Sequence, residues 1–281
     1  MGRVVMSKEN VYGKNVFITG ASSGIGKACA RRFAESGCLV TGVSRNTEET
    51  VESFPGGGSI TMRKLDVTDA DAVRSFVESL PEVDVAVLCA GMGIAGPAET
   101  TPAAMTRRQM EVNYFGTLNA AQPVLTKMKE KRNGLLIIIG SIAGRVSIPM
   151  QSQYSSSKYA LEAFSDAVRM EMKPFGVRAS IIEPGDTKTG FTAARQTMEP
   201  GENGKDGYGG VLQKSVAKMA SDEQNGRSPD SVAEVAYRLA CRKDPPARVP
   251  VGFEYKLLMF LLRLLPDRLK ESILSGMYLP K

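Results

Sequence analysis

The fold of this chain is decided by a glycine-rich stretch near its start, Thr19-Gly20-Ala21-Ser22-Ser23-Gly24-Ile25-Gly26. An apolar, β-rich run at residues 15–19 leads directly into it, and a helical pattern follows. Glycines let the backbone turn tightly and approach a pyrophosphate, and the first N–H groups of a helix carry the positive end of its dipole. A glycine-rich turn alone is unspecific, but its place between a strand and a helix predicts a dinucleotide-binding turn.

Beyond this turn, apolar runs alternate with helical patterns along most of the chain. Continuous apolar strands separated by helices indicate a parallel sheet covered on both faces. We therefore expect an α/β, doubly wound, Rossmann-type fold with a parallel seven-stranded sheet. The predicted strands are residues 15–19, 39–43, 59–65, 83–89, 135–140, 177–183 and 248–251, and the predicted helices are residues 25–36, 69–79, 106–131, 154–175 and 229–243.

The chain has no internal repeat and no linker between two cores. Residues 1–281 are therefore expected to form a single NAD(P)-binding domain. Residues 187–224 are expected to form a lid, in which the Gly-rich residues 201–210 are a mobile insertion rather than a domain boundary. Residues 253–281 are expected to form an apolar helical segment.

Composition excludes several classes of function. With 42% hydrophobic and 23% charged residues among 281, the chain is typical of a globular protein. The net charge is +6, but lysine and arginine are mixed with aspartate and glutamate, so no nucleic-acid binding is expected. Residues 1–13 contain no apolar h-region, so no signal peptide is expected and a cytoplasmic location is favoured.

The chain contains no histidine, which removes every mechanism that needs an imidazole. Residues 20–24 fit the G-x-S-x-G pattern of hydrolases formally, but no histidine can deprotonate Ser22. Zinc sites built on histidine are excluded likewise, and four dispersed cysteines without a C-x-x-C pair make a poor thiolate cage. We expect neither a serine hydrolase nor a bound metal, and reduced rather than disulfide-bonded cysteines.

A proton-transfer site is indicated by Tyr154 and Lys158, one helical turn apart, with Ser141 upstream at the end of an apolar run. At i and i+4 the phenol and the ammonium share one helix face. A nearby cation favours phenolate, so the pKa of Tyr154 is expected to fall from about 10 towards neutral pH, which suits an acid and base. The alternative is a tyrosine and a lysine on a solvated face.

These motifs together resemble the short-chain dehydrogenase/reductase family, and the resemblance covers nearly the whole chain. It is strongest to the hydroxysteroid and retinol dehydrogenase branch. The matching motifs, in the order the family has them, are the glycine pattern at residues 19–26, the adenine-pocket acid Asp66, the helix asparagine Asn113, the catalytic Ser141, Tyr154 and Lys158, and the turn Pro184-Gly185 followed by Thr187.

One position departs from the family pattern. Where the family has Asn-Ala-Gly after the fourth strand, this chain has Cys89-Ala90-Gly91. The small Ala90-Gly91 pair still permits close approach of a cofactor, but the hydrogen bonds of the carboxamide are missing. We expect this change to affect the stability of the sheet more than the chemistry.

The end of the second predicted strand indicates the cofactor. NAD-selective Rossmann domains place an acid there for the ribose 2′-OH, whereas this chain has Ser44 and Arg45. An acid would repel a 2′-phosphate, and a guanidinium suits it, so NADP(H) is predicted, with Ser22 as a further contact. The alternative is that Arg45 lies on the surface beside a loop and binds no cofactor. The expected cofactor-binding residues are Gly20, Ser22, Ser23, Gly24, Ile25, Gly26, Ser44, Arg45, Asp66, Val67, Ala90, Gly91, Tyr154, Lys158, Pro184, Gly185 and Thr187.

The resemblance also implies roles for the catalytic residues. Ser141 would hydrogen-bond the substrate oxygen, Tyr154 would transfer the proton, and Lys158 would hold the ribose hydroxyls and lower the pKa of Tyr154. Asn113 would hold a water that connects Lys158 to solvent. An asparagine that makes a local bond inside its helix is the alternative for Asn113.

The resemblance implies a lipophilic secondary alcohol or ketone as substrate, and a homo-oligomer. Reduction of acyl-dihydroxyacetone phosphate or of small ketones stays open, as does a non-catalytic NADP(H)-binding sensor or scaffold. The large side chains of the expected lid either line an apolar pocket or simply pack on the protein. They are Phe191, Met198, Tyr208, Leu212 and Met219.

The most apolar stretch of the chain is residues 255–266. It is shorter than the roughly twenty residues needed to span a bilayer. With Arg268 and Lys270 after it, one expectation is that it lies at a membrane surface and admits a lipophilic substrate. The alternative is packing against the sheet or against a second subunit.

Overall fold

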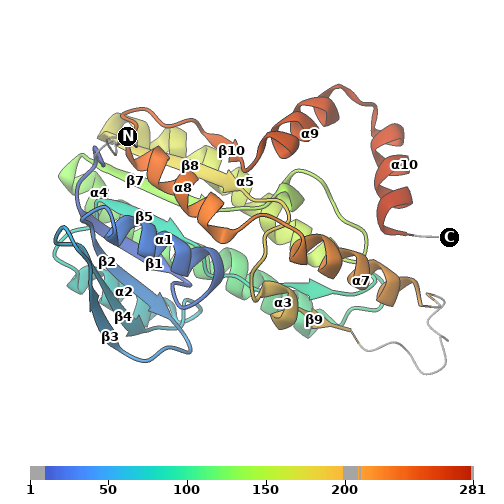
Figure 1. Cartoon of the computed structure of the whole chain (residues 1–281), viewed down its shortest axis with the longest axis horizontal. Coiled ribbons are helices and arrows are strands. Elements are labelled where there is room, and N and C mark those ends of the chain that lie inside the picture. Colours follow the sequence, from blue (N-terminus) through green and yellow to red (C-terminus); the bar gives the residue numbers. More distant parts are fainter. Residues whose placement is uncertain (1–9, 199–207, 209, 280–281) are drawn as a thin grey trace, which may run out of the picture.

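A twisted sheet lies at the centre of the molecule, with helices on both of its faces (Figure 1). The structure is a computed structural model that describes residues 10–198, 208 and 210–279. The sheet has the strand order β10-β8-β7-β5-β1-β2-β4-β3. Its strands are β1 (Asn15–Thr19), β2 (Leu39–Ser44), β3 (Thr50–Ser53), β4 (Ser59–Lys64), β5 (Val85–Leu88), β7 (Gly134–Ile139), β8 (Val177–Glu183) and β10 (Arg248–Pro250).

The predicted doubly wound α/β fold is confirmed, but the sheet has eight strands instead of seven. All seven predicted strands are present and pair in parallel. The additional strand is β3, which pairs with β4 in the antiparallel direction at the edge of the sheet. All four residues of β3 are exposed, so no apolar pattern in the sequence marks it.

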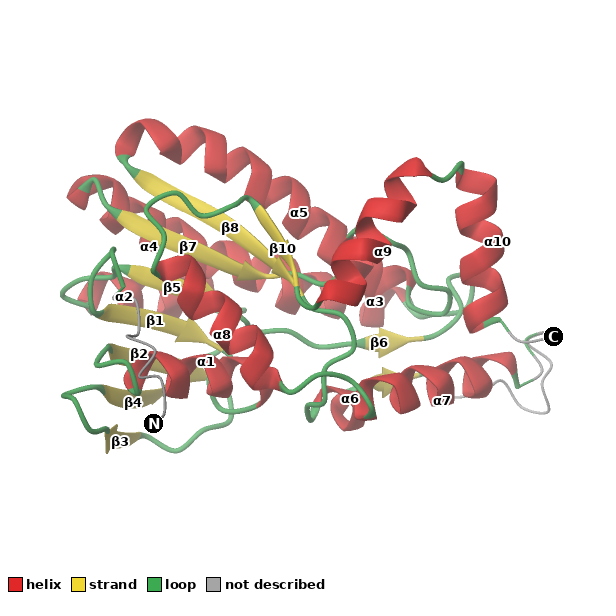
Figure 2. Ribbon diagram, turned by 45° about the horizontal axis from the view of Figure 1, so that its top comes forward, coloured by secondary structure: helices red, strands yellow, loops and turns green. Residues whose placement is uncertain are grey.

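Two hydrophobic layers cover the sheet because its central strands are apolar on both faces. On one face, α1 (Gly24–Ala34) packs beside α8 (Pro229–Ala240). The rings of Phe33 and Tyr237 pack edge to face there, with 5.5 Å between the ring centres. On the other face lie α2 (Ala70–Ser79), α4 (Gly116–Lys131) and α5 (Ser152–Met172). Figure 2 shows the two layers on either side of the strands.

The long helix predicted at residues 106–131 is interrupted. It consists of α3 (Ala103–Met110), a single π-helical turn η1 (Glu111–Phe115) and α4. Asn113 lies in the π-helical turn and is fully buried. Such turns widen a helix by one residue and occur frequently at functional sites.

In its described residues, the segment expected to form a lid, residues 187–224, contains three elements. These are α6 (Phe191–Ala194), β9 (Gln196–Thr197) and α7 (Val211–Gln224). Strand β9 pairs in parallel with β6 (Ile94–Ala95), which ties this segment to the chain after β5. The predicted mobile insertion, residues 201–210, lies outside the described residues except for Tyr208 and Gly210.

The chain ends in two helices, α9 (Phe253–Leu264) and α10 (Asp267–Tyr278). Both stand away from the sheet in Figures 1 and 2. None of the helices in the described part of the chain is long and apolar enough to cross a membrane.

Candidate active site

The parallel strands bring the predicted site residues to one edge of the sheet. β1 lies beside β2 on one side and β5 on the other, so the direction of winding reverses between β1 and β5. In open α/β sheets, ligands bind outside the carboxyl ends of the strands at such a point. The glycine turn, Ser44, Ala90, Ser141 and Gly185 all follow the carboxyl end of a strand, so the predicted residues share this edge.

The glycine turn has the backbone that its sequence predicts. Gly20 and Gly24 adopt φ angles of 70° and 51°, which favour glycine. A Cβ on Gly26 would lie 2.2 Å from the carbonyl oxygen of Gly20, so only glycine fits there. Ser23 is the N-cap of α1 and makes no side-chain capping bond. The turn therefore leaves the start of α1 to an anionic ligand.

Thr19 joins the two strands at the reversal point. Its hydroxyl accepts hydrogen bonds from the backbone N–H groups of Cys89 and Ala90, at 3.0 and 3.2 Å. A Cβ on Gly20 would lie 2.9 Å from the Ala90 backbone, so the two segments touch. Burial raises the pKa of Cys89 to about 11, so its thiol stays protonated. Thr19 thus holds the backbone in which Cys89 replaces the family asparagine.

The two serines predicted to contact NADP(H) meet each other. The Ser22 and Ser44 hydroxyl oxygens lie 2.8 Å apart. Arg45 is exposed beside them and has no acidic partner among the described residues. A free guanidinium next to two hydroxyls can bind a phosphate.

Asp66 and Val67 lie between β4 and α2. One carboxylate oxygen of Asp66 accepts bonds from both the backbone N–H and the hydroxyl of Thr68, at 3.0 and 2.9 Å. The carbonyl of Val67 accepts a bond from Asn119 at 2.9 Å. The second Asp66 oxygen stays available for a ligand.

The three predicted catalytic residues come together. Ser141 is the N-cap of the 3-10 turn η2 (Ile142–Gly144), where its hydroxyl accepts a bond from the Ala143 N–H at 3.1 Å. The Ser141 hydroxyl lies close enough to the Tyr154 phenol to lower the pKa of the phenol. Nζ of Lys158 lies 5.8 Å from the centre of the Tyr154 ring and donates to the carbonyl of Ile139 at 2.9 Å. Tyr154 and Lys158 share one face of α5, as their spacing predicts.

The predicted direction of the Tyr154 pKa is wrong for this structure. Burial raises the pKa of Tyr154 to about 12, and the Ser141 hydroxyl only partly opposes this effect. Lys158 is itself buried, and loss of water lowers its pKa from 10.5 to about 8. The attraction between the two groups favours the phenolate, but the cost of burying each charge outweighs it.

The side-chain amide of Asn113 makes hydrogen bonds to two segments outside its own helix. Its amide oxygen accepts from the N–H of Met92 at 2.8 Å, and its amide nitrogen donates to the Met92 carbonyl at 3.0 Å. The same nitrogen donates to the Ser157 hydroxyl at 3.1 Å. Ser157 lies between Tyr154 and Lys158 in α5, so Asn113 connects the catalytic helix to the chain after β5. Its bonds are long-range rather than local, and its water-holding role stays a prediction.

The turn after β8 is covered by the C-terminal helix α9. A Cβ on Gly185 would lie 2.1 Å from the Tyr255 ring, so the ring packs directly on this glycine. The Tyr255 hydroxyl accepts from the Asp186 N–H at 2.9 Å and donates to the Asp186 carboxylate at 2.8 Å. Pro184 accepts a bond from Ile142 at 3.0 Å, and the Thr187 hydroxyl donates to Gly185 at 3.0 Å. Tyr255 could not be predicted as part of this site, because no local pattern links residue 255 to residue 185.

Thr189 and Phe191, which follow this turn in the chain, both contact residues of the site. The Phe191 ring lies 5.6 Å from the Tyr154 ring and packs against Gly93. Thr189 lies against Gly24 of the glycine turn. The other large side chains predicted to line an apolar pocket instead pack together in a hydrophobic cluster that includes Met150. They are Met198, Tyr208, Leu212 and Met219.

A buried pair of carboxylates behind the catalytic helix was not predicted. Glu162 lies one turn after Lys158 and is buried, as is Glu183 at the end of β8. Arg248 bonds Glu162 at 2.7 Å, and Arg145 bonds Glu183 at 3.1 Å. Burial and the charge of Glu183 raise the pKa of Glu162 to about 7. The only feature of the sequence that could have pointed to Glu162 is its position four residues after Lys158, which places both on one face of the same helix.

Comparisons with known proteins agree with this fold. A family profile for short chain dehydrogenase matches residues 14–200, which contain the glycine turn, Tyr154 and Lys158. The 3-ketodihydrosphingosine reductase of Bacteroides thetaiotaomicron is 35% identical over 269 residues, covering 94% of this chain and 97% of that protein. The NADPH-dependent 3-dehydrocapnine reductase of Ornithobacterium rhinotracheale is 33% identical over 270 residues, covering 91% and 94%.

Solved structures share the fold. A short-chain dehydrogenase from Streptomyces avermitilis superposes with a TM-score of 0.78 at 25% identity, covering 94% of this chain and 96% of that one. A short chain dehydrogenase from Burkholderia cenocepacia, solved in complex with NADP, has a TM-score of 0.72 at 20% identity, covering 96% and 99%.

Proposed function

Because this chain belongs to the short-chain dehydrogenase/reductase family, we propose that it is an NADP(H)-dependent reductase of a lipophilic ketone. As a member of the family, it is an oxidoreductase that acts on ketone and alcohol groups. The observation that carries the proposal is the convergence of Ser141 and Tyr154 beside the buried Lys158. These three groups supply a proton donor, an oxygen-binding hydroxyl and a cation at the carboxyl edge of the sheet.

The proton chemistry favours reduction at neutral pH. With a pKa of about 12, Tyr154 keeps its proton and donates it to the oxygen of a bound carbonyl as negative charge develops there. Ser141 orients the phenol and donates a hydrogen bond to the same oxygen while keeping its own proton. When bound, the cofactor supplies the hydride. The reverse reaction needs the phenolate, so alcohol oxidation is favoured only at higher pH.

The residues at the sheet edge fit NADP(H). The close contact of Gly20 and Gly26 and the uncapped start of α1 suit a pyrophosphate. Ser22, Ser44 and Arg45 would hold the 2′-phosphate, and Lys158 the hydroxyls of the nicotinamide ribose. Asp66 and Val67 would border the adenine, and Ala90-Gly91 and Pro184 to Thr187 the nicotinamide half. The NADP complex of the Burkholderia cenocepacia structure supports the same choice by analogy of fold.

We place the substrate among long-chain ketones that carry a polar head. The names of two relatives, a 3-ketodihydrosphingosine reductase and a 3-dehydrocapnine reductase, support this class. Residues 187–224 would act as a lid over it, with Phe191 against the Tyr154 ring as its apolar contact at the reacting group.

The test is the rate of NADPH oxidation, beside NADH, on a panel of carbonyl compounds. The panel contains 3-ketodihydrosphingosine, a steroid ketone, retinal, acyl-dihydroxyacetone phosphate and a small ketone. We expect turnover of the long-chain keto base with NADPH, and a loss of about 10³-fold or more in Tyr154→Phe. Binding of NADPH by Tyr154→Phe, measured by fluorescence of the reduced nicotinamide, should stay intact.

Two results would contradict the proposal. Turnover that survives Tyr154→Phe unchanged would remove Tyr154 as the proton donor. Tight NADPH binding without turnover of any panel member would favour a non-catalytic cofactor-binding protein.

A further inference from the structure

The C-terminal hairpin, α9 and α10, is attached to the rest of the protein at its two ends. At its start, Tyr255 packs on Gly185 and bonds Asp186. At its far end, the backbone of Tyr278 accepts a hydrogen bond from Ser215 in α7. The hairpin therefore bridges the turn after β8 and the expected lid, while its middle is left without such anchors.

The hairpin exposes most of its large apolar side chains. In α9 only Met259 is buried, and in α10 no residue is. Phe260 is 60% and Leu264 68% exposed, and further apolar side chains continue the surface onto α10. They are Leu269, Ile273 and Met277. Exposed apolar side chains gathered on neighbouring elements mark an interaction surface rather than scattered surface residues.

Cations without acidic partners accompany this apolar surface. Lys256, Arg263 and Arg268 are exposed and form no ion pair with any described residue. Two of the acids of the hairpin are already paired, Glu254 with Arg227 and Asp267 with Lys270. The hairpin therefore presents unpaired positive charge beside its apolar side chains.

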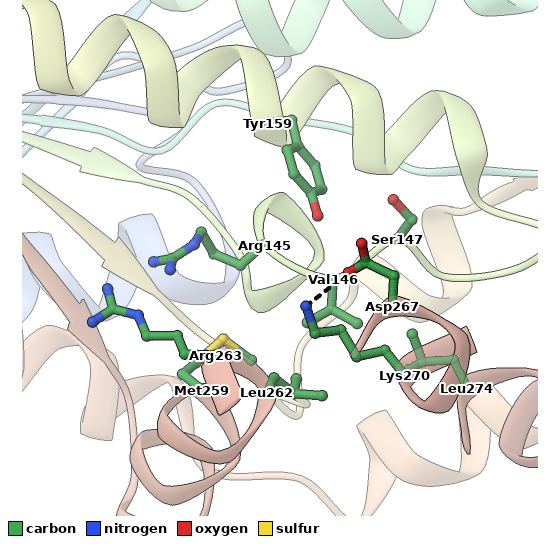
Figure 3. A pocket seen from close by; sticks show the side chains of 10 residues that line it. All are labelled: Arg145, Val146, Ser147, Tyr159, Met259, Leu262, Arg263, Asp267, Lys270 and Leu274. Carbon is green, nitrogen blue, oxygen red and sulfur yellow. Dashed lines mark hydrogen bonds and ion pairs between the residues drawn. The ribbon is translucent and has the colours of Figure 1, made fainter. Parts of the chain in front are cut away.

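A pocket of about 270 Å³ lies under the hairpin, between it and the loop that follows η2. Figure 3 shows Arg145 and Arg263 on one side of it, and the Lys270–Asp267 pair on the other. The Tyr159 hydroxyl points towards the pocket from α5. Three cationic side chains and one carboxylate line this space together with apolar side chains such as Met259. Arg145 is paired with Glu183 and Lys270 with Asp267, so Arg263 is the cation of this lining that is left to bind the phosphate of an amphiphilic molecule.

We propose that the hairpin docks on the surface of a membrane that contains anionic phospholipids. Its apolar side chains enter the boundary between headgroups and acyl chains, and Lys256, Arg263 and Arg268 contact lipid phosphates. The pocket receives the phosphate of one lipid headgroup between Arg145, Arg263 and Lys270. The two helices of the hairpin have 12 residues each, which suits an interfacial position rather than a span.

The charges favour a membrane over a second copy of the chain. A two-fold interface brings the same patch of both subunits together, so the unpaired cations of the two hairpins would be brought close to one another. Glu271 is the one exposed acid of the described hairpin without an ion-pair partner. An anionic lipid surface supplies the missing negative charge without this repulsion.

The first test is sedimentation of the full chain with lipid vesicles. We expect wild type to bind vesicles of phosphatidylcholine mixed with phosphatidylglycerol, and Phe260→Ser/Leu264→Ser to lower the partition coefficient about 10-fold or more. Arg263→Gln/Arg268→Gln should lower binding to the mixed vesicles by about fivefold or more, but not binding to phosphatidylcholine alone. The matched control is Met170→Ser, because Met170 is 70% exposed on α5 and lies outside the hairpin. Equal binding by wild type and Phe260→Ser/Leu264→Ser overturns the proposal.

The second test uses the absence of tryptophan from the chain. A Phe260→Trp variant carries a single tryptophan in the hairpin, and Met170→Trp carries one outside it. We expect the emission of Phe260→Trp alone to shift to shorter wavelength when mixed vesicles are added, and to be quenched by brominated lipids. Emission that is already blue-shifted without vesicles and changes with protein concentration would mean that a second copy covers the hairpin, which overturns the proposal.

Discussion

Strand β7 and helix α9 are both strongly apolar, yet they differ completely in burial. All six residues of β7 are buried, whereas α9 buries only Met259. β7 lies between β5 and β8 in the middle of the sheet, with a helical layer on each face. α9 follows the last strand and contacts the rest of the protein on one side, through Gly185, Asp186, Arg227 and the residues that line the pocket. Apolar composition therefore makes burial of a segment favourable, but the position of the segment in the fold decides whether other parts of the chain bury it.

Two leucines give the largest expected contrast between these regions. Leu136 in β7 is 0% exposed, and Leu264 in α9 is 68% exposed. We expect Leu136→Ala to lower the free energy of unfolding by about 2–5 kcal/mol, because it leaves a cavity in the core. Leu264→Ala should change it by less than about 0.5 kcal/mol. Urea denaturation of the two variants measures both values, and a large loss in Leu264→Ala would mean that the hairpin is packed in solution.

A second contrast compares two lysines. Lys158 is buried with a pKa lowered to about 8, and Lys256 is exposed. Between pH 8 and 10.5 the unfolded chain binds the proton that folded Lys158 has lost, so Lys158 by itself adds stability to the cofactor-free protein as the pH rises through this window. The buried cysteines, whose pKa values are raised, act in the opposite direction there, so the quantity to measure is the difference between wild type and the Lys158 variant. Below pH 8 the buried charge costs up to about 3 kcal/mol, so Lys158→Met should raise the melting temperature at pH 7, and this gain over wild type should shrink towards pH 10.

Lys256→Met should keep the pH dependence of wild type. Differential scanning calorimetry from pH 6 to 10 without cofactor makes this comparison. A Lys158→Met variant that is less stable at pH 7 than wild type would show that the bond from Lys158 to the Ile139 carbonyl outweighs the cost of burial. Turnover should be lost in Lys158→Met in either case.

The smallest of these contrasts separates two exposed arginines. Arg45 lies beside Ser44 at the carboxyl edge of the sheet, and Arg268 lies in the hairpin. Arg45→Ala should raise KM for NADPH about 10-fold or more while changing KM for NADH little, because only NADPH carries the 2′-phosphate. Arg268→Ala should leave both constants unchanged. Steady-state kinetics with both cofactors decides this, and equal effects of Arg45→Ala on both would contradict the NADP(H) assignment.

Much of the fold could be predicted because its signals are local. Each parallel strand is an apolar run between helical patterns. The glycine turn needs backbone conformations and a close contact that only glycine permits. The spacing of Tyr154 and Lys158 placed both on one helix face. Strand β3 and the short strands β6 and β9 had no such signal, because an exposed edge strand and two-residue strands show no periodicity.

Other features depend on partners far apart in the sequence. The pKa of Tyr154 is raised by burial, which no local pattern shows. Tyr255 covers Gly185, and Glu162 meets Glu183 across α5 and β8. Four of the five large side chains of the expected lid pack in a hydrophobic cluster with Met150. This agrees with the alternative that they pack on the protein.

The sequence by itself determined the seven parallel strands and the main helices between them, the glycine turn and the identity of the residues at the carboxyl edge. It could do so because periodicity and backbone conformation are properties of neighbouring residues. Only the tertiary structure decided how far the catalytic groups are removed from water, what covers the turn after β8, and which apolar segment stays exposed. These depend on desolvation and packing, and both are set by segments that meet only when the chain has folded.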